Sequence, residues 1–529
     1  MKRFFVSGLL SAVVMLLAVN LMAQQSGRVF DTEVPGEPNK EFQFLAFYIN
    51  QGVTSNFFPT NEFLRGQVLG RMFGRNSVTT SDTATTAYFE QRLIPFFIYQ
   101  PALFDGKAIL RAVFEIDWTW GDVSYGAGPN QGGAVSGHQV NLQTQNIELE
   151  LIPKAGWMIN LGLQRMFDNP YNPYRTLADK MLENGYRMTY FGTHAVGVTL
   201  YRNADFHRFK AGFFKFYEND IFKDDDVNMY EFQYERNINK LWRAAVSTHY
   251  VRDRGNGRGG VSILGQGLNS QLTEYNGVFR FKFGSAPYEA DVVWLGTHFS
   301  RNADYMIDRF FLNGFFNYNL GVVNVLRESG WRTGADIAGF AANLRTGYRY
   351  GQTLQDRVTL DLMYTSGDEN GLDDRRYSGV MTGNTWAAPG GFFINSGAYL
   401  LFPHGNVVNR FTPVIADLSN IGYGFVGGTA NFSKGIIPNR LHAKVGTAAA
   451  MSNATPIGGG RNMGVEANAG IVYNLGPFMS LELHGAHLWL GDFFDSADDR
   501  YGVAVNGGVQ GVRPANPWTA FIVYKWLMF

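Results

Sequence analysis

Charged residues recur at every second position in many short segments, with a spacing that could line a water-filled passage. In residues 107–120, Arg111, Glu115 and Asp117 share one alternation, while apolar residues, many of them aromatic, hold the other. A period of two is typical of a strand with one wet and one dry face. Rings of charge along a passage select ions and orient solutes. The candidate pore-lining residues are Arg111, Glu115, Asp117, Glu231, Glu235, Arg243, Arg280, Lys282, Arg345, Arg349, Asp361, Arg440 and Lys444.

These residues carry both signs, and the alternative to a selective lining is that they pair across adjacent strands and hold the structure rigid. From residue 271 onward, the basic members of the set outnumber the acidic ones. That excess predicts a weak preference for anions.

Three acidic segments are candidates for calcium binding, because carboxylate oxygens are the ligands that Ca²⁺ prefers. They lie at 223–226, 368–374 and 495–499. None has the spacing of an EF-hand loop with its closing glutamate. We therefore expect solvated loops, which could also join lipopolysaccharide through bridging divalent cations, and no dedicated metal site.

Other residues with catalytic or metal-binding side chains do not form a recognisable motif. His484 and His487 lie three positions apart, which places them on opposite faces of a strand and makes them poor partners for one metal ion. The segment "DLSNIG" (417–422) has Asp417 where barrel phospholipases have a histidine. We predict no cofactor and no enzymatic activity. A hydrolase whose triad assembles only in space is the alternative.

The composition favours a sheet-built protein. The chain of 529 residues contains 62 Gly, 44 Phe, 26 Tyr and 10 Trp, which are turn-forming and strand-forming types. Lys plus Arg and Asp plus Glu are balanced at 45 each, so nothing suggests a nucleic-acid partner. The absence of cysteine excludes disulfides and cysteine-ligated metals.

The N-terminal residues resemble a secretory signal. Lys2 and Arg3 precede an apolar run from Phe4 to Leu21, and a small residue, Ala23, offers a cleavage site. We expect 1–23 to be a cleaved signal peptide and 24–529 to be one barrel domain, in which 24–41 is an N-terminal periplasmic segment. The alternative is an uncleaved N-terminal membrane helix.

About twenty segments of 9 to 14 residues alternate like 107–120, and no helical segments are expected between them. Their connections alternate in length: 203–205 and 475–477 are short, whereas 253–270 and 491–515 are long. Transmembrane barrels have this pattern, with tight periplasmic turns and long outer loops. We predict an all-β, antiparallel, up-and-down transmembrane barrel of about 18 strands, within a range of 16 to 20.

Parts of the chain are ambiguous in this scheme. Residues 42–53 are a doubtful first strand, and the pattern needs an extra strand near 406–416. The apolar segment 300–333 could fold inward as a constriction or plug, or could be two further strands. The segment 175–185 has helix-like spacing and could lie over the mouth or on the surface.

The cost of exposing charge to lipid decides which face points outward. A Lys or Arg that faces lipid at the bilayer midplane costs about 2–4 kcal/mol, so the aromatic alternation faces lipid and the charged one faces the lumen. The terminal strand ends at Phe529 after alternate apolar residues, which resembles the C-terminal signal of outer-membrane barrels, although Lys525 departs from it. We expect the barrel-assembly machinery to recognise this strand. Pairing with the first strand would remove its free edge.

Three segments resemble the large outer-membrane porins of the alginate-export type. One carries that family's "SGD…N…D" pattern, one its penultimate strand and loop entry, and one its glycine-rich strand and following loop. They are "MYTSGDENGLDDRRYSGV" (363–380), "LELHGAHLWLGDFFDSADD" (481–499) and "INLGLQRMFDNPYNPYRTL…GTHAVGVTLY" (159–201).

The chain also departs from that family, since Leu163 stands where it has an arginine, and Leu488 or Trp489 where it has the first phenylalanine of its "F-x-x-G-x-F" loop entry. The resemblance implies a monomeric barrel that conducts small or extended anionic solutes. It does not identify alginate as the solute.

Together these patterns predict a porin of the Gram-negative outer membrane, in contact with lipid and lipopolysaccharide. Hydrophilic solutes, with some preference for anionic ones, would diffuse through its charged lumen. The second interpretation is a filled barrel that acts as a scaffold or binds a partner at the cell surface. An enzyme is the third, and it would require a compact catalytic cluster in the lumen or loops.

Overall fold

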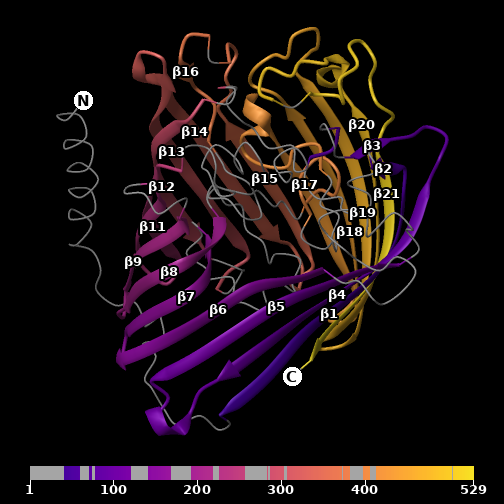
Figure 1. Ribbon diagram of the computed structural model, residues 1–529. Helices are drawn as coiled ribbons and strands as arrows, with labels where there is room; N and C mark the ends of the chain where they lie inside the picture. Colours follow the sequence, from indigo (N-terminus) through magenta and orange to yellow (C-terminus); the bar gives the residue numbers. More distant parts are fainter. Residues whose placement is uncertain are drawn as a thin grey trace.

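The computed structural model describes residues 41–59, 71–73, 78–120, 141–167, 192–218, 225–255, 283, 286–302, 307–371, 373–381, 397–404, 413–502 and 504–528. These residues are almost entirely strands and connections (Figure 1). No helix in this part of the chain is long and apolar enough to cross a bilayer. The short 3-10 helices are η3 (Ala102–Phe104), η5 (Asn420–Gly422) and η6 (Asp492–Asp495).

The strands are β1 (Phe42–Ser55), β2 (Phe57–Pro59), β3 (Val78–Thr80), β4 (Thr86–Tyr99), β5 (Ala108–Trp120), β6 (Asn141–Lys154), β7 (Trp157–Phe167), β8 (Gly192–Asn203), β9 (His207–Tyr217), β10 (Val227–Asn237), β11 (Trp242–Asp253), β12 (Tyr288–Arg301), β13 (Phe310–Arg327), β14 (Gly330–Arg349), β15 (Arg357–Thr365), β16 (Arg376–Tyr377), β17 (Phe425–Ile437), β18 (Leu441–Met451), β19 (Asn462–Gly476), β20 (Met479–Leu490) and β21 (Trp518–Met528).

Eighteen of the described strands form one closed antiparallel barrel, which confirms the predicted fold class and strand number. Neighbours in the barrel are neighbours in sequence, apart from the small elements β2, β3 and β16. The ring closes where β1 pairs with both β4 and β21, with Ala46 opposite Met528. Closure satisfies every sheet edge, and a sheet that spans lipid requires this because no water is present there to bond free N–H and C=O groups. The doubtful first strand is therefore a full member of the wall.

The two faces of the wall differ as the alternation predicted. In β15, the side chains of Val358, Leu360, Leu362 and Tyr364 are 40–45% exposed on the outside. Asp361 lies between them on the inner face and is buried. Reversing the strand would place a carboxylate among apolar side chains at a substantial energetic cost. The outer surface of the barrel is thus suited to a bilayer.

Long connections gather at one end of the barrel and short turns at the other, and the C-terminal strand ends at the short-turn end (Figure 1). The connection from β15 to β17 is the largest at the long-loop end, and the turns at the opposite end include 204–206 and 438–440. This arrangement agrees with the expected division into outer loops and periplasmic turns.

In its described residues the segment 300–333 forms strands and not a constriction, so the alternative of further strands is correct. It contains the end of β12, all of β13 and the start of β14. β13 and β14 have 18 and 20 residues, longer than a bilayer crossing of 9–11 needs, and only Glu328 and Ser329 connect them. Gly330 enters β14 with φ of 94°, a left-handed conformation that glycine adopts without steric cost. The turn of this hairpin lies at the long-loop end of the barrel.

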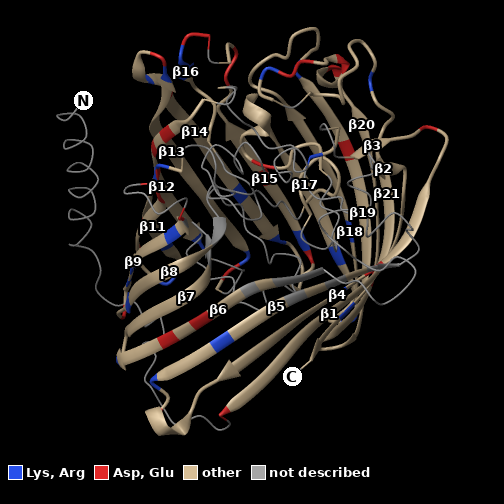
Figure 2. Ribbon diagram, in the orientation of Figure 1, with Lys and Arg blue, Asp and Glu red and all other residues tan. Residues whose placement is uncertain are grey.

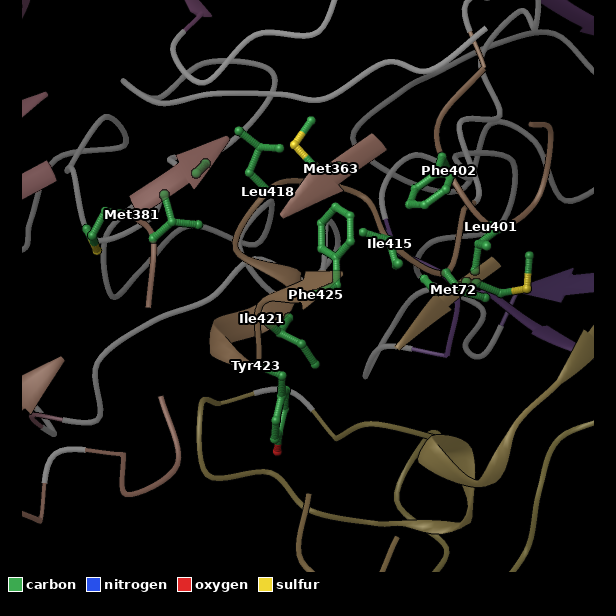
Figure 3. Packing of buried hydrophobic residues seen from close by; sticks show 14 of the residues in the cluster. Met72, Met363, Met381, Leu401, Phe402, Ile415, Leu418, Ile421, Tyr423 and Phe425 are labelled. Carbon is green, nitrogen blue, oxygen red and sulfur yellow. The ribbon is translucent and has the colours of Figure 1, made fainter. Parts of the chain in front are cut away.

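Much of the lumen near the long-loop end is filled by an apolar cluster contributed by inward-folded loops (Figure 3). Leu401, Phe402, Ile415 and Leu418, from the β15–β17 connection, are almost completely buried there. Met72 joins them from the β1–β4 connection. The extra strand expected near 406–416 is not formed in its described part, because residues 413–416 belong to this loop packing.

The turn between β14 and β15 is organised by the carboxylate of Asp356. It accepts N–H groups of Gln352 (3.1 Å), Thr353 (3.0 Å) and Gly435 (3.1 Å), and lies 3.2 Å from the ammonium of Lys434. The backbone N–H of Thr353 is the main cause that holds the pKa of Asp356 well below its ordinary value. The charged carboxylate is therefore the form that stabilises this turn.

Asp356→Asn is expected to lower stability at pH 7, and the difference from the wild type should shrink as the pH falls. A group with a depressed pKa in the folded state stabilises the fold above its unfolded pKa of about 3.9 and loses that contribution below it. Urea unfolding in lipid vesicles at pH 7 and pH 3 measures both differences. If the wild type and the variant differ in the free energy of unfolding by the same amount at both pH values, the charge of Asp356 does not stabilise the turn.

Candidate functional site

The β15–β17 connection enters the lumen, and a single carboxylate anchors its central part to the wall. Glu466 of β19 accepts the N–H groups of Tyr399 (2.8 Å), Leu400 (2.9 Å) and Leu401 (2.8 Å). We call residues 397–404 the lumen loop. Three consecutive N–H groups on one buried carboxylate make an anion-binding arrangement of backbone, here filled by the protein's own side chain. The lumen loop is therefore docked by specific bonds as well as by apolar packing.

A neighbouring amide completes this anchor. Asn468 of β19 donates to Glu466 (2.9 Å) and to the carbonyl of Gly397 (3.0 Å). On the loop side, Val414 and Ile415 donate their N–H groups to the carbonyls of Leu400 and Leu401 at 2.9 and 3.0 Å. The lumen loop thus lies between β19 and the following segment of the same connection.

A second part of the wall holds the beginning of the same connection. The indole N–H of Trp294 in β12 donates to the carbonyl of Met381 at 2.8 Å, and the N–H of Met381 donates to Asn319 of β13 at 3.1 Å. Trp294 and Asn319 are fully buried. The connection is therefore fixed at two separate places on the barrel wall.

Below the lumen loop, a buried polar network joins it to β18, β20 and β21. The Tyr399 hydroxyl and His484 Nδ1 share a hydrogen bond of 2.8 Å, and His484 Nε2 lies 2.9 Å from Glu482. Lys525 of β21 donates to the same carboxylate at 2.9 Å. Lys444 lies 4.7 Å above the ring of Tyr399, a cation–π geometry. The network gives partners to three charged side chains, Glu482, Lys525 and Lys444, each of which would be costly to bury alone.

The other part of the inner wall, formed by the earlier strands, carries ion pairs across adjacent strands. Figure 2 shows the charges of β5 and β6 close together, where Arg111 lies 3.5 Å from Glu148 and 3.0 Å from Glu150. Lys210 of β9 lies 2.7 Å from Glu231 of β10. Arg111 lies directly opposite Glu148, and Lys210 lies two positions from the residue opposite Glu231, so these are cross-strand neighbours.

Further pairs follow along the wall. Arg243 lies 3.3 Å from Glu235, and Arg345 lies 3.9 Å from Asp361. The side chains of Arg111, Arg243 and Arg345 remain 25%, 19% and 15% exposed. Because these side chains point inward, that exposure is to space inside the barrel. The inner wall therefore combines mutual pairing with surface that solvent can reach.

Most of the candidate pore-lining residues that the structure describes lie on the inner face of the barrel. Seven of its members lie on the inner face of described strands: Arg111, Glu231, Glu235, Arg243, Arg345, Asp361 and Lys444. Arg349 is the half-buried last residue of β14. Glu115 and Asp117 belong to β5, but their side chains lie outside the described part, as do Arg280 and Lys282 entirely.

Arg440 is placed differently from the prediction. It lies in the turn between β17 and β18 and is exposed at the short-turn end, not on the inner face of a strand. The reason is local: the N–H of Arg440 closes a turn on the carbonyl of Ile437 at 3.0 Å, so β18 begins one residue later.

Several residues that hold the lumen together were not singled out from sequence. They are Glu148, Glu150, Lys210, Trp294, Glu466 and Glu482. A charged residue among apolar and small neighbours, as Glu466 is in β19, was the available signal. The loop residues that it binds lie more than sixty positions away, so the role of the charge is not readable locally.

The acidic segments are used within the loops. Asp368 accepts the N–H of Ser378 (2.9 Å) and the hydroxyl of Tyr501 (2.9 Å), while Asp495 pairs with Arg513 at 2.8 Å. The carboxylates of Glu218, Asp225 and Asp226 lie within 4.8 Å of one another. Lys215 pairs with Glu218 and Asp226, which supplies positive charge to that group without an ion.

The residues considered for catalysis have structural contacts. Ser419 donates both its N–H and its hydroxyl to Asp417, a side-chain turn that precedes η5. His484 lies inward and His487 lies on the other face, beside Trp489, as their spacing predicted. Both arrangements are explained by packing and turn formation.

Neither the family models nor the curated proteins contain a match to this chain. Similar solved structures include Pseudomonas aeruginosa OccK2 (OpdF) in complex with glucuronate, with 10% identity, a TM-score of 0.45 and coverage of 95% of this chain and 99% of that one. Acinetobacter baumannii DcaP, an outer-membrane channel, has 10% identity, a TM-score of 0.41 and coverage of 93% and 100%.

Pseudomonas aeruginosa OpdK, solved with vanillate, is a further neighbour at 11% identity, with a TM-score of 0.43 and coverage of 92% of this chain and 98% of that one. All three likenesses concern the shape of the barrel. The resemblance to alginate-export porins is not supported, because no family model matches this chain.

Proposed function

We propose that the protein is an outer-membrane channel of a Gram-negative bacterium, through which small hydrophilic solutes diffuse. The observation that carries this proposal is the contrast between the two faces of one closed wall. Apolar side chains are exposed outside, and partly exposed charged side chains such as Arg111 and Arg243 lie inside. A barrel of this size encloses an aqueous space unless loops fill it.

The passage is narrowed by the lumen loop and its apolar packing, so the solutes are small. Lys444, over the Tyr399 ring of the lumen loop, and Arg345, on the inner face of β14, are inward cations, and they support a weak preference for anions. The other candidates, Arg111, Glu115, Asp117, Glu231, Glu235, Arg243, Arg280, Lys282, Arg349 and Asp361, stay part of the proposed lining, whereas Arg440, in the turn between β17 and β18, does not. We propose that the protein acts without a cofactor or resident metal and is not an enzyme.

We also propose which molecules surround the barrel in the membrane. The apolar outer face contacts lipid, and the long loops face lipopolysaccharide. The barrel-assembly machinery recognises the terminal strand, which ends the barrel beside β1. We propose a monomer, with residues 1–23 removed as a signal peptide and 24–41 on the periplasmic side.

A second function is favoured by one observation: the large apolar cluster among the inward-folded loops. If this packing closes the lumen completely, the barrel is a scaffold whose loops bind a partner at the surface.

Swelling of proteoliposomes in isotonic sugar solutions separates the two functions. The channel predicts swelling whose rate falls steeply with the size of the sugar, because the passage is narrow. Vesicles that contain folded protein and do not swell even in the smallest sugar would favour the scaffold. Empty vesicles and vesicles with heat-unfolded protein serve as controls.

A further inference from the structure

A separate cavity of about 1300 Å³ opens at the long-loop end, between the β13–β14 hairpin and the neighbouring loops. The residues that contribute charge to its lining are Arg327, Arg332, Arg375, Arg500, Glu369 and Asp373. Figure 2 shows basic and acidic groups gathered in the loops above β13–β16. Four arginines around one space are unusual, because like charges repel unless counter-charges are present.

The hairpin presents two of these arginines on its inward face. Val325 is buried and Leu326 is exposed on the outside, so Arg327 returns to the inner side by the alternation of the strand. Arg332 lies directly opposite Val325 in the ladder and shares its face. Both guanidinium groups therefore belong to the mouth of the lumen and not to the lipid surface.

The fourth arginine has a structural role. Arg500 donates to Asp498 (2.7 Å), to the carbonyl of Thr455 (3.2 Å) and to the carbonyl of Glu369. These bonds tie three loops together at the floor of the cavity. Its charge is already matched by Asp498, so it holds the cavity in shape.

The other three arginines are not matched in this way. Within the described residues, Arg327, Arg332 and Arg375 form no ion pair, although Glu369 and Asp373 line the same cavity. Arg375 comes from a loop held to β14 through its carbonyl, which accepts the N–H of Asp336 at 2.8 Å. Arg332 donates its Nε–H only to the hydroxyl of Ser329, at 3.3 Å, in the described part of the chain. Two separate segments therefore direct guanidinium groups that have no ion pair among the described residues to one space.

The other lining groups define the shape of this space. Tyr501 is buried and donates its hydroxyl to Asp368, and burial together with this carboxylate raises the pKa of Tyr501 well above its ordinary value. The phenol thus remains neutral and fixed. Asp368 also holds Ser378, so the wall of the cavity is a bonded framework.

We propose that this cavity is a binding site for a small hydrophilic anion with two or more carboxylate groups, which is captured before it enters the channel. Guanidinium groups bind carboxylates through paired hydrogen bonds, and arginines on two segments can hold two such groups at once. Glu369 and Asp373 lower the net positive charge of the cavity, so an anion with only one carboxylate gains little binding energy from it. A cavity of this volume admits a ligand larger than acetate.

The inference rests on the proposed channel only for its role in transport, and binding itself can be measured without conduction. Calorimetric titration of the full protein in detergent with citrate is the test, with acetate as the monocarboxylate. We expect binding of citrate and at least about tenfold weaker binding by the variant Arg327→Gln/Arg332→Gln. Arg375→Gln, on the other side of the cavity, should also weaken citrate binding. Because Arg375 is not part of the hairpin, this result would show that the double variant does not act merely by disturbing the hairpin.

Arg440→Gln is the matched control, because it removes an exposed arginine at the opposite end of the barrel. It should bind citrate as the wild type does. Equal affinity of the wild type and the double variant, or equal affinity for citrate and acetate, would overturn the assignment. Citrate binding without conductance would leave this site in place and contradict the channel, whereas conductance without citrate binding would do the reverse.

Discussion

Replacing Glu466 with alanine is expected to release the lumen loop and to produce larger, frequently switching currents. The substitution removes the carboxylate that accepts the N–H groups of Tyr399, Leu400 and Leu401. Each buried N–H left without a partner costs about 1–3 kcal/mol. A loss of about 3 kcal/mol alone changes the ratio of docked to undocked loop by more than 100-fold.

The undocked lumen loop would leave a wider passage, so single-channel recording in a planar bilayer measures the effect directly. Glu148→Ala is a charge-matched control, because it removes one inward carboxylate far from the loop and leaves Glu150 beside Arg111. The currents of Glu466→Gln should be intermediate between those of Glu466→Ala and those of Glu148→Ala, because the amide oxygen of glutamine can still accept hydrogen bonds. Currents of Glu466→Ala that match those of the wild type would mean that this carboxylate does not hold the loop.

The second large effect is expected at the junction of the last two strands. Glu482→Ala would leave Lys525 charged and buried without its carboxylate, and His484 with Tyr399 but without Glu482. Removing one member of a buried ion pair typically costs about 3–5 kcal/mol. This loss would fall on the strands that close the barrel, and urea unfolding in vesicles should show a clearly lower midpoint.

The double variant Glu482→Ala/Lys525→Met separates a buried unpaired charge from general damage to packing. Replacing both members of a buried pair with apolar groups is often neutral or stabilising. Most of the lost stability should therefore return in the double variant. If the double variant is as unstable as the single one, the cost arises from packing and not from the charge of Lys525.

The strands were predictable from sequence because alternation is a local property that burial on one face imposes. The face of each strand followed from the cost of charge in lipid, as β15 shows with Asp361 inside and Leu360 and Leu362 outside. The β13–β14 hairpin was harder to assign. Its strands are longer than a bilayer crossing, and they are joined by a turn of only two residues. The segment therefore fitted neither the strand length nor the loop length expected of a barrel, so strands and an inward loop were both open for it.

The content of the lumen could be predicted only in part. Arg111, Glu231 and Asp361 were placed on the inner face by alternation. The lumen loop was not foreseen, because its anchors join Glu466 to residues 65 to 67 positions earlier. Lys525 was noticed as an exception within an apolar strand, but its partner Glu482 lies on another strand at a register that only the folded sheet reveals.

Whether the lumen conducts is measured by single-channel recording across a planar bilayer in a salt gradient. We expect stable steps of open current for the purified, folded protein, with a reversal potential whose sign shows a weak preference for anions. Protein that is folded, as judged by its heat-modifiable mobility on a gel, yet remains silent in the bilayer would show that the lumen does not conduct. The inward-folded loops would then be a plug and the barrel a scaffold.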